Sequence, residues 1–153
     1  AAGKGIYNPQ TPLTGRMTHY NKGANAEREL LQTLYLAGMA VCRAAGSGKG
    51  KDTIPTPDAI ALRKGKIYAF ECKAWKAANL NISTQQMNDL EEWCRLAGAE
   101  LVIAWKIPRK GWRFLEKKHF HENEKSYSIS VQKAHDEGKR IEHFQVEPLV
   151  LEA

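Results

Sequence analysis

The sequence has few cysteines and no long apolar run. Its three cysteines, Cys42, Cys72 and Cys94, are odd in number and far apart, which argues against both a disulfide framework and a cysteine zinc site. We expect buried, reduced thiols. No stretch approaches the roughly 18 apolar residues of a membrane span, and the first residues lack the apolar core of a signal peptide. We therefore expect an intracellular protein without a membrane partner.

Acidic residues are also scarce relative to basic ones. The chain has 17 Asp and Glu against 23 Lys and Arg, a formal net charge of +6, which favours a polyanionic partner. Nucleic acid is the leading candidate and an anionic membrane surface the weaker one. A length of 153 residues suits one domain. Glycine and proline recur in residues 1–21 without sustained periodicity, so we expect a flexible N-terminal arm there and a single domain over residues 22–153.

A short β-hairpin is predicted near the middle of the chain. Two apolar runs, residues 59–62 and 67–70, flank the dipeptide Lys64-Gly65, and a glycine between β-type runs is typical of a hairpin turn. If the loop is these two residues, Asp58 lies opposite Glu71. Directly opposed side chains have Cβ atoms roughly 5 Å apart, so the two carboxylates repel each other unless a positive charge lies between them.

The same end of the hairpin carries an amine. Side chains alternate along a strand, so Lys73 projects to the same side as Glu71. Two acids that hold Mg²⁺ and a lysine that orients water or neutralises a phosphate are typical of a phosphodiester-cleaving site. The alternative is an ordinary exposed hairpin with scattered charges. The pattern Pro57-Asp58 … Glu71-Cys72-Lys73 resembles the motif of the PD-(D/E)xK nuclease superfamily.

A helix is predicted before the hairpin. Leu30 and Leu34 recur at helical spacing, with Asn25 as the N-cap and Gly38 as the end. Glu27 leads this apolar stripe. Its carboxylate either interacts with the helix dipole in the first turn or is a third acid that leans over the hairpin site.

Two further segments carry basic residues. Residues 44–52 form a glycine-rich basic loop that fails the P-loop pattern, so it is either a solvated linker or a loop whose amides and Ser47 hydroxyl approach a phosphate. Residues 108–114 predict a basic turn into a strand, with cations suited to phosphate contacts.

The remaining pattern indicates an α/β fold. Residues 83–86 match a capping box, and an amphipathic helix follows that ends at Gly98. Residues 101–105 predict a buried strand, and the strand–helix–strand order predicts that it runs parallel to the second hairpin strand. Residues beyond Phe114 have no clear pattern, and their apolar end either caps the core or forms a subunit contact.

Four regions of the sequence are similar to the archaeal Holliday junction resolvase family. They are Lys22-Gly23 with residues 27–31, Gly38 with residues 43–48, residues 55–58, and Glu71-Cys72-Lys73, within a match that runs roughly from Lys22 to Phe114. The resemblance implies a restriction-endonuclease-like fold, in which a central mixed β-sheet with an active-site hairpin is flanked by helices. It also implies a homodimer that resolves four-way DNA junctions by paired, symmetric, Mg²⁺-dependent nicks in recombination and repair, with Mn²⁺ able to substitute, in the cytoplasm or at the nucleoid.

The resemblance also assigns residues. Glu27, Asp58 and Glu71 match acidic residues that are expected to bind the metal, Lys73 matches a catalytic lysine, and Ser47 matches an active-site serine. A further glutamine, Gln86, is a weaker match beside the site. The cations expected to contact DNA are Lys22, Arg28, Arg43, Lys49, Lys51, Arg109, Lys110 and Arg113.

Two other functions remain open at the level of sequence. One is another PD-(D/E)xK endonuclease that acts on linear or damaged duplex DNA, and the other is a DNA-binding module that has lost its chemistry. The acids with Lys73 favour an enzyme, and the segments around Glu27 and Ser47 favour the resolvase.

Overall fold

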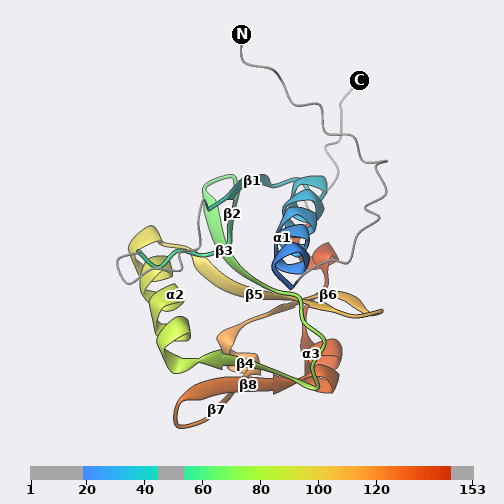
Figure 1. The fold of residues 1–153 in the computed structure, drawn as a ribbon. Coiled ribbons are helices and arrows are strands. Elements are labelled where there is room, and N and C mark those ends of the chain that lie inside the picture. Colours follow the sequence, from blue (N-terminus) through green and yellow to red (C-terminus); the bar gives the residue numbers. More distant parts are fainter. Residues whose placement is uncertain (1–18, 45–53, 146–153) are drawn as a thin grey trace, which may run out of the picture.

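A five-stranded mixed sheet, with helices on both faces, is the centre of the computed structural model, which describes residues 19–44 and 54–145 (Figure 1). Its strand order is β1-β2-β3-β5-β6, and a second sheet has the order β4-β8-β7. The helices and strands are α1 (His19–Leu36), β1 (Ala40–Arg43), β2 (Ala59–Arg63), β3 (Lys66–Lys73), β4 (Asn79–Ser83), α2 (Thr84–Ala97), β5 (Glu100–Ile107), β6 (Gly111–Leu115), β7 (His121–Glu122), β8 (Ser126–Ser130) and α3 (Val131–Glu137), with 3₁₀ turns η1 (Lys117–His119) and η2 (Ile141–Phe144). The restriction-endonuclease-like arrangement expected from the sequence is confirmed.

The predicted hairpin is present in the predicted register. Strands β2 and β3 are antiparallel, with Leu62 opposite Ile67. Lys64 and Gly65 have φ angles of 46° and 83°, the left-handed backbone that a two-residue hairpin turn requires. Glycine adopts this backbone without steric cost, which explains its place in the turn. Strand β3 also runs parallel to β5, as the strand–helix–strand order predicted.

The two long helices differ in how well the sequence predicted their starts. Helix α2 has Ser83 as its N-cap, with the hydroxyl accepting a hydrogen bond from the Gln86 amide, and Gly98 in the left-handed conformation at its end. Helix α1 begins at His19, so the prediction that Asn25 caps it is wrong. Residues 19–24, which precede Asn25, are also helical, although they do not extend the apolar stripe of the helix.

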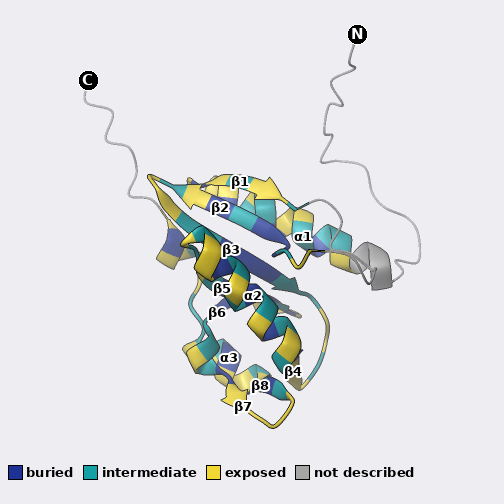
Figure 2. Ribbon diagram, turned by 90° about the vertical axis from the view of Figure 1, so that its left-hand side faces the viewer, coloured by how far each residue is buried: buried dark blue, intermediate teal, exposed yellow. Residues whose placement is uncertain are grey.

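Each face of the central sheet has its own apolar core. On one face, α1 and η2 pack on the sheet through Leu30, Leu34, Phe70 and Phe144. On the other face, α2 and the smaller sheet pack around Ile103, Trp105, Ile107 and their neighbours. Alternate residues of β5 therefore face opposite cores, and Figure 2 shows the central strands β3 and β5 largely buried. Burial on both sides explains why these strands read as continuous apolar runs.

The part of the chain beyond Phe114 completes this architecture. In the smaller sheet, β8 pairs with β4 on one side and with β7 on the other, and Phe144, which is 5% exposed, closes the core beneath α1. The expectation that the C-terminal part caps the core therefore holds as far as residue 145.

All three cysteines are free thiols, but Cys42 is exposed on β1, so the expectation that all are buried is wrong for this residue. None of the helices in the described part is long and apolar enough to cross a membrane.

Candidate active site

Two carboxylates are buried where the hairpin ends. Asp58 and Glu71 are only 7% and 8% exposed. Asp58 directly precedes β2, whose first residue, Ala59, pairs with Phe70, so Asp58 lies beside Glu71 as the sequence predicted. The backbone N–H of Cys72 donates a hydrogen bond to Asp58 Oδ2 at 2.8 Å. This bond fixes one acid against the strand that carries the other.

Lys73 and Gln86 complete the contacts of Glu71. The Lys73 ammonium lies 3.8 Å from Glu71 Oε1 and donates a hydrogen bond to Gln86 Oε1 at 3.4 Å. The amide nitrogen of Gln86 donates to Glu71 Oε1 at 3.3 Å. Gln86 lies in the first turn of α2, so the cap formed by Ser83 sets the position of its side chain relative to the hairpin. The structure therefore brings together four of the predicted site residues.

The two buried acids perturb each other's protonation. Burial raises the pKa of Glu71 to about 8, with the charge of Asp58 as the next cause, and the Lys73 ammonium opposes this shift. Burial and the charge of Asp58 also raise the pKa of the Cys72 thiol far above its usual range. The site thus contains more negative charge than its single lysine offsets, and its thiol stays neutral.

A cleft of about 410 Å³ opens onto these acids. It runs between the segment before β2 and the first turns of α2. Its lining includes Ile54, Pro55, Thr56, Asp58, Glu71, Ser83, Gln85, Gln86, Asp89 and Leu90. The acids are therefore buried within the protein yet open to a substrate from one side.

Glu27 lies near this site with a different partner from the one predicted. Its carboxylate forms an ion pair with Arg43 at 2.8 Å and accepts a hydrogen bond from Arg43 Nε at 2.9 Å. Because α1 begins eight residues earlier, Glu27 is not in the first helical turn, so the dipole alternative is wrong. Its charge contributes to the raised pKa of Glu71. Within residues 19–44 and 54–145, however, no three His, Cys, Asp or Glu side chains are grouped to hold a metal ion.

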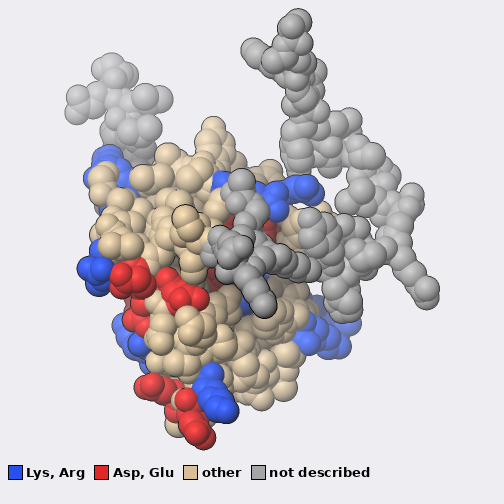
Figure 3. All heavy atoms as spheres, turned by 60° about the vertical axis from the view of Figure 1, so that its left-hand side comes forward, with Lys and Arg blue, Asp and Glu red and all other residues tan. Residues whose placement is uncertain are grey.

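The expected DNA-contacting cations fall into three groups. Arg28 and Arg43 are exposed on α1 and β1, and Arg109 and Lys110 are exposed at the turn between β5 and β6. Since β5 is parallel to β3, this turn follows the carboxyl end of β5, on the same side of the sheet as the carboxyl end of β3, where Lys73 lies. The second group, Lys49, Lys51 and the side chain of Lys22, lies outside the described residues, as does the candidate site residue Ser47. In Figure 3, Lys and Arg side chains outside the grey atoms lie mostly towards the margins of the face.

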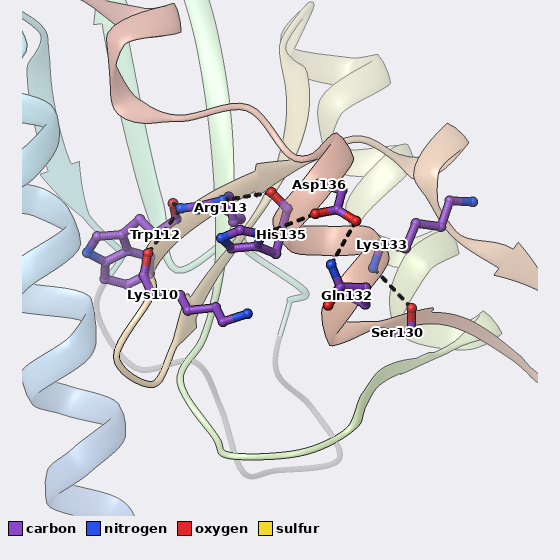
Figure 4. Close-up of polar contacts among 8 residues, drawn as sticks. All are labelled: Lys110, Trp112, Arg113, Ser130, Gln132, Lys133, His135 and Asp136. Carbon is purple, nitrogen blue, oxygen red and sulfur yellow. Dashed lines mark hydrogen bonds and ion pairs between the residues drawn. The ribbon is translucent and has the colours of Figure 1, made fainter.

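Arg113 is the third case, and the prediction that it contacts phosphate is wrong. It is 5% exposed, and its guanidinium donates hydrogen bonds to the backbone carbonyls of Lys110, Trp112 and His135 (Figure 4). Charge and position near a basic turn suggested a surface role, but strand alternation turns this side chain inward. It joins the β5–β6 turn to α3.

One residue beside the site was missed in the sequence. The ammonium of Lys73 lies 5.2 Å from the ring centroid of Trp75, which is 46% exposed. Its position only two residues after Lys73 was visible in the sequence, but β3 ends at Lys73, so side-chain alternation does not predict where Trp75 points.

A restriction-endonuclease-like sheet whose hairpin presents two buried acids to an open cleft, with a lysine 3.8 Å from one of them, defines a metal-dependent nuclease, an enzyme that hydrolyses phosphodiester bonds. A sequence model described as "Archaeal holliday junction resolvase (hjc)" matches residues 18–146. The chain belongs to this family.

Individual relatives agree with this assignment. The chain is 38% identical over 109 residues to the crossover junction endodeoxyribonuclease Hjc of Archaeoglobus fulgidus, covering 71% of this chain and 79% of the relative. It is 36% identical over 95 residues to the protein of the same name from Sulfolobus acidocaldarius, covering 61% and 65% of the two chains. The solved structure of the Archaeoglobus fulgidus Hjc, a Holliday junction resolvase, superposes with a TM-score of 0.71 and 33% identity, covering 80% of this chain and 93% of that one.

Proposed function

We propose that this protein is a homodimeric, Mg²⁺-dependent endonuclease that resolves four-way DNA junctions by two symmetric nicks, in recombination and repair. The observation that carries the proposal is the pair of buried carboxylates, Asp58 and Glu71, held beside Lys73 at the open cleft. Membership of the resolvase family supports a four-way DNA junction as the substrate.

The donor groups of the site suit Mg²⁺, with Mn²⁺ as a substitute. Asp58 and Glu71 offer hard carboxylate oxygens, which these ions prefer. The thiol of Cys72 does not compete, because its raised pKa keeps it protonated. The raised pKa of Glu71 reflects two buried acids without sufficient positive charge, and a divalent ion would remove this imbalance. Asp58 and Glu71 are therefore the residues that would hold it.

The side chains around the acids define the rest of the chemistry. When bound, a divalent ion supplies charge stabilisation for the phosphate. The Lys73 ammonium, held by Gln86 and Glu71, is placed to donate to a phosphate oxygen as its negative charge grows, or to orient the attacking water. Gln86 contacts both groups, so it fixes the distance between the lysine and the acid.

A homodimer follows from the substrate. Resolution into two intact duplexes requires cuts in two strands of like polarity at related positions, and one hairpin site cuts one strand. A two-fold symmetric dimer presents two such sites, and its axis can coincide with that of the junction. Phosphate contacts from Arg109, Lys110 and the other exposed cations would then fix the orientation of the DNA without reading its sequence.

The test is a comparison of labelled substrates. Junction, nicked, flap and linear DNA of shared sequence are incubated with the protein and Mg²⁺, with Lys73→Ala as the inactive control. We expect the junction to be cut far faster than the others, and Lys73→Ala to bind the junction without cutting it. Equal cutting of linear duplex would instead identify a general nuclease, and binding without cleavage in any divalent ion would identify a module that has lost its chemistry.

A further inference from the structure

Trp75 is an exposed aromatic residue next to the site lysine. Four tryptophans occur in the chain, all in the described part, and Trp75 alone is exposed, at 46%, whereas Trp105 is fully buried. Large aromatic side chains are usually buried for most of their surface, because each removes a large apolar area from water. An exposed indole beside the site lysine is therefore available to a partner outside the protein.

The position of Trp75 is fixed from two sides. Its backbone carbonyl accepts a hydrogen bond from the indole N–H of Trp105 at 3.2 Å, which ties the segment after β3 to the buried core. Its ring lies 5.2 Å from the Lys73 ammonium, within the range of a cation–π contact. Lys73 is in turn held by Gln86. The ring is thus placed relative to the lysine and the acids before any substrate binds.

The exposed surface of the ring suits one kind of ligand. Trp75 is 46% exposed although the Lys73 ammonium lies over its ring, so part of the indole remains open to a ligand. A nucleobase is a flat aromatic group that stacks on such a surface, and Lys73, whose ammonium lies 5.2 Å from the ring centroid, offers a positive charge for a phosphate next to it. A nucleotide whose phosphate contacts Lys73 therefore places its base within reach of Trp75.

In an intact duplex this stacking surface has no free partner, because each base is stacked on both sides. At the branch point of a four-way junction, the last base pair of each arm can lose one stacking neighbour. We propose that Trp75 is a stacking platform for a base at the branch point, and that it helps the protein to distinguish branched from linear DNA. This proposal rests on the proposed function, because it assigns part of the junction selectivity to one residue.

The test measures DNA binding without catalysis. Affinities for a four-way junction and a linear duplex of the same sequence are measured by fluorescence anisotropy in EDTA for the wild type, Trp75→Phe, Trp75→Leu and Trp75→Ala. Stacking on an aromatic side chain corresponds to about a 5- to 150-fold effect on affinity. We expect Trp75→Ala and Trp75→Leu to lose junction affinity in this range, Trp75→Phe to keep most of it, and the affinity for linear duplex to change little.

A second readout separates stacking from an effect on Lys73. The fluorescence of a 2-aminopurine base at the branch point should be quenched when the wild type or Trp75→Phe binds. It should stay unquenched when Trp75→Leu or Trp75→Ala binds. Tyr35→Ala is the matched control, since Tyr35 is 66% exposed two helical turns beyond Glu27 and should leave both readouts unchanged.

Three results would overturn the proposal. The first is an equal loss of affinity for junction and linear DNA. The second is unchanged binding and quenching in all Trp75 variants. The third is loss of cleavage with binding and quenching intact, a result that would limit Trp75 to positioning Lys73. Circular dichroism confirms that each variant is folded. Failure of the proposed function is a separate result, because it appears in the wild type as no preference for the junction.

Discussion

Replacement of Glu71 by glutamine is predicted to stabilise the metal-free protein at neutral and alkaline pH. The ordinary pKa of this carboxyl is 4.5, and burial beside Asp58 raises it to about 8 in the folded protein. Between these values the folded state therefore binds more protons than the unfolded state, so this group makes the free energy of unfolding fall as the pH rises from 4.5 to 8. Glutamine has the same shape and no charge, so it removes this dependence.

The size of the effect follows from the shift. The difference between 8 and 4.5 is 3.5 pH units, and each unit corresponds to 1.36 kcal/mol, so the upper limit is about 5 kcal/mol at pH 8. At pH 7 the corresponding limit is smaller, about 3 kcal/mol, because pH 7 lies 2.5 units above the ordinary pKa of 4.5. Glu71→Gln should therefore be more stable than the wild type by a few kcal/mol at pH 7 to 8, and by little near pH 4.5.

The assay is urea denaturation in EDTA at several pH values between 4.5 and 8. Other groups also titrate over this range, so the informative quantity is the difference in unfolding free energy between variant and wild type. Glu124→Gln changes an exposed glutamate and should give a difference that does not vary with pH. Adding Mg²⁺ at pH 8 should stabilise the wild type and have little effect on Glu71→Gln. A pH-independent difference for Glu71→Gln would refute the reasoning about the buried acids.

Three further predictions test other parts of the site and fold. Asp58→Asn should abolish cleavage while junction affinity in a gel shift stays the same or improves, because a negative charge near the phosphate is lost; parallel loss of binding would indicate a structural role. Arg113→Ala should lower the unfolding free energy by about 1 to 3 kcal/mol, since three backbone carbonyls lose a donor, and an unchanged urea midpoint would contradict this. Arg109→Ala should leave stability unchanged and reduce the slope of log affinity against log salt by about 0.9 per contact; an unchanged slope would remove Arg109 from the interface.

The sequence predicted the site well where local pattern decides the geometry. The glycine of the Lys64-Gly65 turn fixed the hairpin loop, and strand alternation then placed Asp58, Glu71 and Lys73 together. The cap at Ser83 likewise fixed the position of Gln86. In each case a few neighbouring residues determine the structure.

Predictions failed where distant contacts decide. The charge of Arg113 suggested a surface position, but carbonyls from the β5–β6 turn and α3 surround it, and their proximity depends on the whole fold. Glu27 lies close enough to Glu71 to affect its pKa, but the sequence did not reveal its ion pair with Arg43, sixteen residues on. Strand β4 was missed because its short alternating pattern gains stability only by pairing with β8.

The central claim, that two copies of this site cut a four-way junction in a coordinated way, is tested most directly with a supercoiled plasmid that extrudes a cruciform. The first nick relaxes the plasmid, and the cruciform is then reabsorbed. A dimer that makes both cuts during one binding event gives linear product, whereas independent sites give nicked circles. We predict predominantly linear product at limiting protein concentration with Mg²⁺. Predominantly nicked circles would contradict the account.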